Sequence, residues 1–343
     1  MLSVTIAADK ITAEHAHDLR QAAELLGGAS DVTLLGHVNP DADAFGSSVG
    51  LATALREMGA TVRVSFGEPA DEVPESLRHL DPHGLYIPAA EVPAAPSLLV
   101  ALDTAELSRL GPLAGRVAAT RETGGAVLVI DHHSSHKFFG THNLVDPKAE
   151  ATAAIVVRLL DELGAHLTEP IGRALYAGLL TDTGSFRRAT PATHRAVARL
   201  LATGVDAAAV ARPLLDTHPF GYLRMLSAVL ARAELDPAGA HGLGVVGTVV
   251  LRDDVAGLRP EEMESVINVI RTTAEAEVAL VLKQVADEEW TGSLRAVGRV
   301  DVSAAALALG GGGHRFAAGF TVRGPLDEVL ARVRAAVDRA PLV

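Results

Sequence analysis

Three short apolar runs in the first half of the chain each lead into an acidic residue. Residues 31–36 are followed by "HVNPDAD" (37–43), and the runs 97–103 and 126–131 each end in an aspartate. Between the first run and the apolar stretch 61–66, the spacing of apolar residues predicts a helix. Strand, helix and strand in this order form a βαβ unit, so the sequence predicts a parallel α/β sheet.

Acidic side chains therefore lie where the predicted strands end. Ligands of parallel sheets bind beyond the carboxyl ends of the strands, where the connecting loops converge. A further acid, Asp182, lies in "TDTGSF". Taken singly, each acid is also compatible with a turn or a helix cap. Their shared placement favours one common site, and its acids are Asp41, Asp43, Asp103, Asp131 and Asp182.

Histidines accompany these acids. The predicted ligands comprise four carboxylates and two imidazoles: His37, Asp41, Asp43, Asp103, His132 and Asp182. So many buried acids would repel one another and remain partly protonated unless divalent cations neutralised them. The chain has no cysteine, so any metal must use oxygen and imidazole ligands, which favour Mn²⁺, Mg²⁺, Co²⁺ or Fe²⁺. Two such ions would activate water and stabilise both oxygens in phosphoester hydrolysis.

A glycine run near the C-terminus predicts an anion site. "GGGGH" (310–314) allows backbone amides to approach an anion closely, and His314 with Arg295 could bind phosphate. The alternative is a flexible glycine loop. Between residues 291 and 320 there are three arginines and one aspartate, although the whole chain carries a net charge of −12. This local reversal of charge favours the anion site.

Length and charge limit the classes of protein that the chain can belong to. At 343 residues, 48% of them hydrophobic, the chain is long enough for about two domains. The acidic balance argues against a protein that coats long nucleic acid. We expect no membrane span and no signal peptide, and therefore a cytoplasmic protein. Glycines and a proline at 236–244 interrupt regular structure. A second series of elements is expected after them, with strands at 245–251, 277–285, 291–297 and 316–322 and helices at 260–274 and 303–308.

The order of the motifs resembles that of the DHH phosphoesterase superfamily, in its DHH/DHHA1 branch of nanoRNase and pAp-phosphatase proteins. "HVNPDAD", "LDT", "DHH", "TDTGSF" and "GGGGHRFAAGF" occur in the family's order over residues 30–325. This resemblance implies an α/β fold. It comprises an N-terminal DHH domain with a mainly parallel sheet flanked by helices, a smaller C-terminal α/β DHHA1 domain, and an active site in the interdomain cleft. We place these parts at 1–205 and 231–343, with a helical linker at 206–230.

The resemblance also implies roles for individual residues. One metal would be bound by His37, Asp41 and Asp103, and the other by Asp43, Asp103, His132 and Asp182, so that Asp103 bridges. The catalytic residues would be His133, Asp131 and Asp103. In this set His133 orients the phosphate or protonates the leaving oxygen, and Asp131 holds a histidine tautomer. The substrate-binding residues would be Arg295, Gly312, Gly313 and His314.

The expected cofactors are two Mn²⁺ ions, with Mg²⁺ or Co²⁺ as alternatives. The expected reactions are hydrolysis of short oligoribonucleotides and linear dinucleotides such as pApA to mononucleotides, and of pAp to AMP. Cyclic di-AMP is an additional candidate substrate. Long nucleic acid and membranes are not expected partners, and the resemblance implies a homodimer. The family often carries Asn where this chain has His136, which bears on substrate preference. The alternatives are a family II-like inorganic pyrophosphatase, a RecJ-like single-strand exonuclease and a nucleotide-sensing module without activity.

Overall fold

The computed structural model describes residues 13–68 and 72–343. The chain divides into two compact units, the first ending at Thr217 and the second beginning at His218. The segment 206–230, expected as a helical linker, contains α7 (Ala207–Leu215) and α8 (Phe220–Ala231), and the division falls between these two helices. Each unit has its own sheet and its own apolar core.

The first unit is built on a five-stranded parallel sheet. Its strands are β1 (Asp31–Gly36), β2 (Thr61–Phe66), β3 (Leu98–Leu102), β4 (Ala126–Asp131) and β5 (His142–Val145), in the order β2-β1-β3-β4-β5. All neighbouring pairs are parallel. Helices cover both faces of such a sheet, which explains why the strands read as continuous apolar runs.

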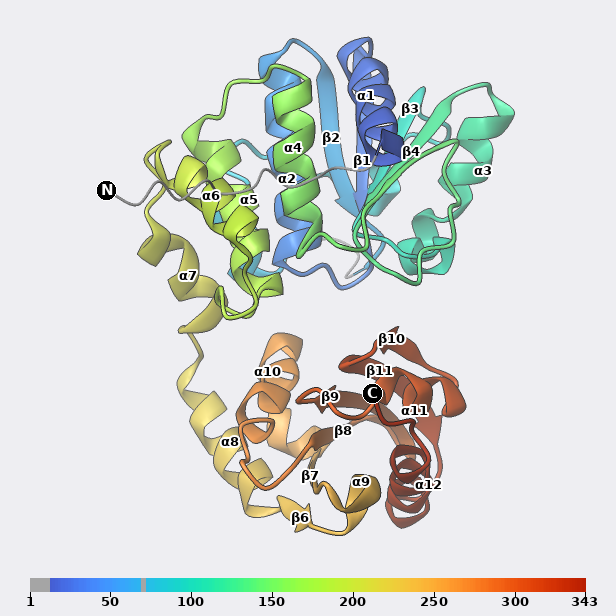
Figure 1. Ribbon diagram of the computed structural model, residues 1–343, viewed down its shortest axis with the longest axis vertical. Coiled ribbons are helices and arrows are strands. Elements are labelled where there is room, and N and C mark those ends of the chain that lie inside the picture. The colour runs from blue at the N-terminus through green and yellow to red at the C-terminus, as the bar shows by residue number, and fades with distance from the viewer. Residues whose placement is uncertain (1–12, 69–71) are drawn as a thin grey trace. The chain divides into compact units, whose positions relative to one another are not determined.

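The helices of this unit lie on the two faces of the sheet (Figure 1). One face is covered by α1 (Ala13–Gly27), α2 (Ala42–Glu57) and α4 (Thr152–Glu162), with α5 (Glu169–Asp182) and α6 (Pro191–Leu201) packed outside them. The other face is covered by α3 (Gly115–Glu122) and the 3₁₀ segment Leu107–Leu113. Side chains alternate along β3. Val100 and Leu102 pack toward the helices α1, α2 and α4, and Leu99 packs toward α3 and the 3₁₀ segment on the other face.

The strand order determines where the site forms. The strands β1, β3 and β4 are adjacent and parallel, so the residues that follow them meet at one edge of the sheet. The predicted metal ligands follow these three strands, except Asp182, which ends α5.

The second unit is built on a six-stranded mixed sheet. Its strands are β6 (Glu234–Asp236), β7 (Val245–Val250), β8 (Val278–Ala286), β9 (Glu289–Ala296), β10 (Gly312–His314) and β11 (Ala317–Arg323), in the order β10-β11-β9-β8-β7-β6. Only β7 and β8 run parallel among the described pairs. The predicted α/β fold with a parallel first sheet and a second α/β unit is confirmed.

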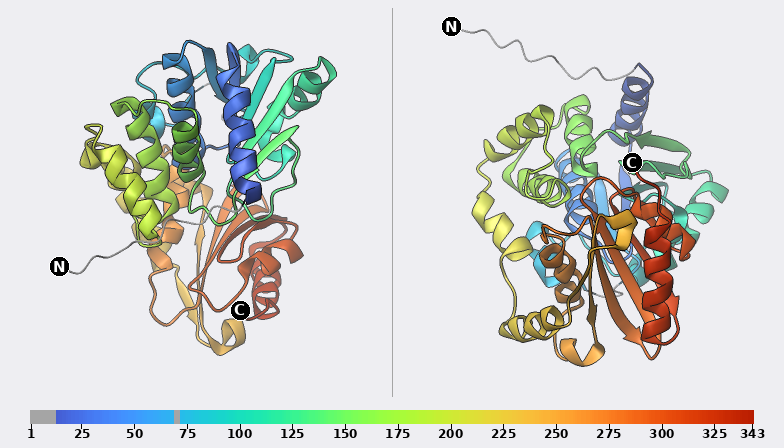
Figure 2. Two further views of the ribbon diagram at one scale, coloured as in Figure 1. Left: turned by 45° about the horizontal axis from the view of Figure 1, so that its top comes forward. Right: turned by 60° about the horizontal axis from the view of Figure 1, so that its bottom comes forward.

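Helices also cover both faces of the second sheet. On one face lie α11 (Val302–Ala308) and α12 (Leu326–Asp338), the latter alongside the strands in Figure 2. On the other lie α8 and α10 (Pro260–Ile270). The remaining short elements are α9 (Gly239–Gly242) and the 3₁₀ segments Glu75–Leu80, Ala89–Glu91 and Arg252–Val255. A search of the described part of the chain finds no helix with the length and apolar character needed to span a membrane.

Candidate metal centre

The first group of ligand-type atoms lies where β1 and β3 end. His37 follows β1, Asp103 follows β3, and Asp41 precedes α2. The Nε2 atom of His37 lies 3.6 Å from Oδ2 of Asp103 and 3.8 Å from Oδ2 of Asp41. One ligand atom from each of the three residues lies within 4.8 Å of the other two. This spacing allows all three residues to bind one ion.

A second group lies beside the first. Its members are Asp43 in the first turn of α2, His132 after β4 and Asp182 at the end of α5. Nε2 of His132 lies 3.3 Å from Oδ2 of Asp182 and 3.5 Å from Oδ1 of Asp103. Asp103 therefore directs Oδ2 toward His37 in the first group and Oδ1 toward His132 in the second.

The geometry of Asp41 is compatible with both roles that the sequence left as alternatives, a helix cap and a metal ligand. Its Oδ1 accepts hydrogen bonds from the backbone N–H groups of Asp43 and Ala44, both at 3.0 Å, so it caps α2. Its Oδ2 lies toward His37. The cap fixes the orientation of the carboxylate and leaves Oδ2 directed toward His37.

The backbone of Asp103 is held in an unusual conformation. Its φ is +54°, in the left-handed region that side-chain-bearing residues seldom adopt. Such a conformation costs about 1–3 kcal/mol and is typical of functional sites. A hydrogen bond from its N–H to the carbonyl of Ile130 on the neighbouring strand, at 3.0 Å, helps to maintain it.

The start of α4 binds the carboxylate of Asp43, a feature that sequence reasoning missed. The backbone N–H of Thr152 donates to Oδ2 of Asp43 at 2.6 Å, and that of Ala153 donates to Oδ1 at 2.9 Å. Ser47 adds its hydroxyl to Oδ1 at 3.2 Å. The hydroxyl of Thr152 donates to Oδ1 of Asp103 at 2.9 Å. The partial positive charge of a helix N-terminus suits a buried carboxylate, but nothing in the local sequence of α4 indicates Asp43 as its partner.

The electrostatics of the cluster favour the binding of positive charge. Burial raises the pKa of Asp43 well above its usual value, and the charges of Asp103 and Asp41 raise it further. Burial also raises the pKa of Asp182 well above its usual value, and the charge of the neighbouring Asp43 raises it further. Burial lowers the pKa of His37, but hydrogen bonds and charges from Asp103 and Asp41 outweigh this and raise it to about 10.

Divalent cations fit this donor set. Asp43 has no solvent exposure and Asp103 is 4% exposed, so water cannot neutralise their mutual repulsion. Carboxylate oxygens with imidazole nitrogens suit Mn²⁺ and Mg²⁺. Two ions sharing Asp103 would remove the repulsion that raises the carboxyl pKa values.

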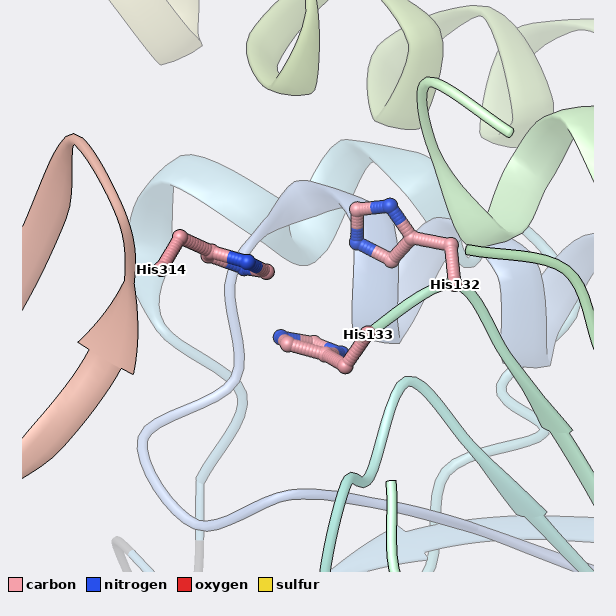
Figure 3. A group of neighbouring side chains, drawn as sticks. All are labelled: His132, His133 and His314. Carbon is pink, nitrogen blue, oxygen red and sulfur yellow. The ribbon is translucent and has the colours of Figure 1, made fainter. Parts of the chain in front are cut away.

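His133 is oriented by Asp131. Its Nδ1 donates to Oδ1 of Asp131 at 2.7 Å, and the same oxygen accepts the backbone N–H of His132 at 2.9 Å. Asp131 is fully buried. The rings of His132 and His133 lie beside each other after β4, with centroids 4.8 Å apart (Figure 3). Burial lowers the pKa of His133, but the hydrogen bond to Asp131 and the charge of Asp103 raise it more.

His136, at the position where the family often carries Asn, is buried behind Asp131. Its Nδ1 accepts the backbone N–H of Phe138 at 2.8 Å, so its proton is on Nε2. Nε2 lies 4.0 Å from Oδ2 of Asp131. His136 therefore faces the second oxygen of the carboxylate that orients His133.

In the second unit, Arg295 and His314 occupy one row of the sheet. Arg295 on β9 is opposite Ala317 on β11, and Ala317 is opposite His314 on β10. Residues in one row direct their side chains to the same face, here the face opposite α11 and α12, since Leu294 faces those helices. The two backbones are separated by two strand spacings, roughly 10 Å.

The second half of the glycine run is a strand, and the first half is a turn that leads into it. Gly312 and Gly313 belong to β10, which pairs with β11. Gly313 has a φ of +137°, and a Cβ there would come within 2.6 Å of the carbonyl oxygen of Ala317. Close approach of two backbones therefore accounts for this glycine, in addition to any contact with an anion.

Comparison with protein families identifies the chain. Residues 31–179 match the DHH family, N-terminal domain, and residues 245–340 match the DHHA1 domain. The chain belongs to the DHH family. Together with the carboxylate and imidazole groups described above, this makes it a metal-dependent phosphoesterase, as the sequence predicted.

Three similar proteins place this member of the DHH family more closely. The chain is 36% identical over 323 residues to the bifunctional oligoribonuclease and PAP phosphatase NrnA of Thermus thermophilus, covering 93% of each chain. It is 32% identical over 190 residues to a probable manganese-dependent inorganic pyrophosphatase of Streptococcus mutans, covering 52% of this chain and 57% of that protein. The solved structure of an exopolyphosphatase-related protein from Bacteroides fragilis shares the fold, with a TM-score of 0.85, 22% identity, and coverage of 97% and 98%.

Proposed function

We propose that this phosphoesterase is a Mn²⁺-dependent enzyme that hydrolyses short oligoribonucleotides and linear dinucleotides such as pApA to mononucleotides, and pAp to AMP. The observation that carries the proposal is two adjacent groups of ligand-type atoms, with one carboxylate oxygen of Asp103 directed toward each group. Similarity to the Thermus thermophilus oligoribonuclease and PAP phosphatase over 93% of both chains supports the substrate class. Cyclic di-AMP, which contains the same phosphodiester bonds, is a further substrate to test.

The proposed ligands are His37, Asp41 and Asp103 for one ion, and Asp43, Asp103, His132 and Asp182 for the other. When bound, two divalent ions would supply an activated water and stabilise the negative charge that develops on the phosphate oxygens. The donor set suits Mn²⁺, and a manganese-dependent relative aligns with 52% of the chain.

His133 is the proposed general acid. Asp131 accepts a hydrogen bond from the Nδ1–H group of His133. Nε2 is therefore the nitrogen that would transfer a proton to the leaving oxygen. The raised pKa of His133 keeps the ring protonated closer to neutral pH, as a general acid requires. The hydrogen bond to Asp131 holds the ring of His133 in one orientation.

The proposed substrate-binding residues are Arg295, Gly312, Gly313 and His314. Arg295 can form paired hydrogen bonds to a phosphate, and His314 in the same row can add another. These contacts suit a substrate that carries a terminal phosphate. The net charge of −12 disfavours long nucleic acid.

The test is a comparison of substrates with the purified full chain. Turnover of pApA, pAp, cyclic di-AMP, a five-nucleotide RNA and pyrophosphate is measured with Mn²⁺ and with EDTA, and products are identified by mass spectrometry. We expect release of AMP from pApA and pAp that EDTA abolishes. Phosphate from pyrophosphate alone would replace the proposal with a pyrophosphatase. Degradation of long single-stranded DNA in a parallel reaction would indicate a RecJ-like exonuclease.

A further inference from the structure

Thr152 contacts both of the buried aspartates nearest the second ligand group. It is the first residue of α4 and has no solvent exposure. Its hydroxyl donates to Oδ1 of Asp103, 49 residues earlier in the chain, at 2.9 Å. Its backbone N–H donates to Oδ2 of Asp43 at 2.6 Å. One residue therefore connects two proposed ligands that belong to different elements.

The two contacts differ in what a substitution can remove. Any residue except proline supplies the N–H that binds Asp43. Only a residue with a donor group on its side chain can supply the second hydrogen bond, to Asp103. The hydroxyl is therefore the part of Thr152 that depends on its identity.

The hydroxyl acts on one oxygen of Asp103 in particular. Oδ1 accepts from Thr152 and lies 3.5 Å from Nε2 of His132, whereas Oδ2 lies 3.6 Å from Nε2 of His37. The hydrogen bond from Thr152 thus restrains rotation of the carboxylate at the oxygen that belongs to the group of His132 and Asp182. Restraint matters here because the backbone of Asp103 has a φ of +54°, and the residue does not hold this conformation by its own preference.

Burial makes the loss of this bond costly. Asp103 is 4% exposed and Thr152 is not exposed, so water is poorly placed to replace the hydroxyl. A buried acceptor that loses its donor has nothing to compensate for its removal from water. Residues that hydrogen-bond to metal ligands commonly change metal affinity by about 10–100-fold when they are removed.

We propose that Thr152 is a positioning residue of the metal centre, whose hydroxyl fixes Asp103 for the ion bound with His132 and Asp182. The inference rests on the proposed two-ion site but not on the identity of the substrate. It predicts an asymmetric effect, in which the loss of the hydroxyl weakens one of two Mn²⁺ equivalents and spares the other.

The experiment measures Mn²⁺ binding by titration calorimetry, on protein stripped with EDTA and then freed of chelator. Thr152→Val removes the hydroxyl and keeps the shape and the backbone N–H. Thr152→Ser keeps a hydroxyl. Thr53→Val is the matched control, because Thr53 on α2 is equally buried and its hydroxyl has no hydrogen-bond partner among the described residues.

We expect Thr152→Val to bind one Mn²⁺ as the parent does and the second about 10–100-fold more weakly. Thr152→Ser should restore most of this loss, and Thr53→Val should bind both ions normally. If Thr152→Val does not fold, as judged by circular dichroism, Thr152→Ala removes the same hydroxyl with a smaller side chain. Parent-like affinity for both ions in the folded variant, or an equal loss in Thr53→Val, would overturn the inference.

The same titration separates this inference from the proposed function. A parent protein that binds two Mn²⁺ and leaves every nucleotide intact would contradict the proposed substrates while the role of Thr152 is still measured. A parent that binds fewer than two Mn²⁺ would overturn both the two-ion site and the role of Thr152 within it.

Discussion

Gly178 on α5 packs directly against Asp43 on α2. A Cβ at position 178 would lie 2.5 Å from Oδ1 of Asp43 and 2.9 Å from Cβ of Ala153. Gly178→Ala should therefore push the carboxylate away from the N-terminus of α4. We expect a loss of about 1–3 kcal/mol in the free energy of unfolding and roughly 10-fold weaker Mn²⁺ binding. Denaturant unfolding and calorimetry measure the two effects.

The control for this prediction is Gly115→Ala. Nothing lies within 4 Å of a Cβ built at Gly115, which begins α3. Alanine there should leave Mn²⁺ binding unchanged and stabilise the fold by about 0.4–1 kcal/mol through the unfolded state. Unchanged Mn²⁺ affinity in Gly178→Ala would show that Asp43 does not depend on the space beside it.

Asp103→Asn should remove activity and retain the fold. Asparagine keeps the shape of the side chain but offers one carbonyl oxygen in place of a carboxylate that faces both ligand groups. We expect turnover to fall by at least about 10³-fold, since the electrostatic contribution of a catalytic site has this order. Asp161→Asn, which removes a surface ion pair with Arg199 on α6, is the matched control. Near-normal turnover in Asp103→Asn would contradict the two-ion site.

Removal of metal should make stability depend on pH. In metal-free protein the pKa values of Asp43 and Asp182 are raised, so the unfolded chain binds fewer protons and stability falls as pH rises through these values. His37 acts in the same direction, because the stability it contributes below pH 6.5 is lost as pH rises through its pKa of about 10. Asp103, with a lowered pKa, acts oppositely but only below the usual carboxyl range.

Mn²⁺ should reverse this trend, because the ion replaces the protons. We expect the difference in Tm between Mn²⁺-loaded and EDTA-treated protein to increase from about pH 5 to about pH 8. At 100 times the dissociation constant the stabilisation should be about 2.7 kcal/mol. A difference in Tm that is the same at every pH would argue against metal binding by these carboxylates.

Arg295→Ala should weaken substrate binding without affecting metal. A hydrogen bond between a charged donor and a phosphate contributes about 1.5–3 kcal/mol, so KM for pApA should rise at least about 10-fold. The content of Mn²⁺ should stay unchanged. Arg323→Ala on β11, whose side chain is 80% exposed, serves as the control. A fall in Mn²⁺ content in Arg295→Ala would assign the residue a different role.

The first sheet could be predicted well because its strands are buried on both faces. The run 126–131 coincides with β4, and 97–103 contains β3 with one extra residue at each end. A continuous apolar run ending in a polar residue leaves little freedom in placing a buried parallel strand. The helix expected at 260–274 ends earlier, at Ile270, because helix ends depend on caps and contacts that the apolar pattern does not contain.

Other features depend on contacts between distant segments. The strand β10 consists of Gly312, Gly313 and His314, and glycine disfavours strands, so only its pairing with β11 reveals it. Thr152 is one threonine at a helix start, and nothing in its local sequence indicates Asp103 as its partner. The proximity of His136 to Asp131 likewise results from the turn after β4, which brings its ring back toward the strand end.

The packing of α2 against α5 has a consequence for which ions the protein can accept. Asp43 lies in the first turn of α2 and Asp182 ends α5, and the two backbones come so close at Gly46 that a Cβ there would lie 2.3 Å from the carbonyl oxygen of Ala174. Because backbone meets backbone at this crossing, we expect the spacing of the two carboxylates to change little unless one helix moves. Ca²⁺ needs longer bonds and more ligands than the smaller Mg²⁺, so we expect the proposed site to bind Mn²⁺ or Mg²⁺ in preference to Ca²⁺.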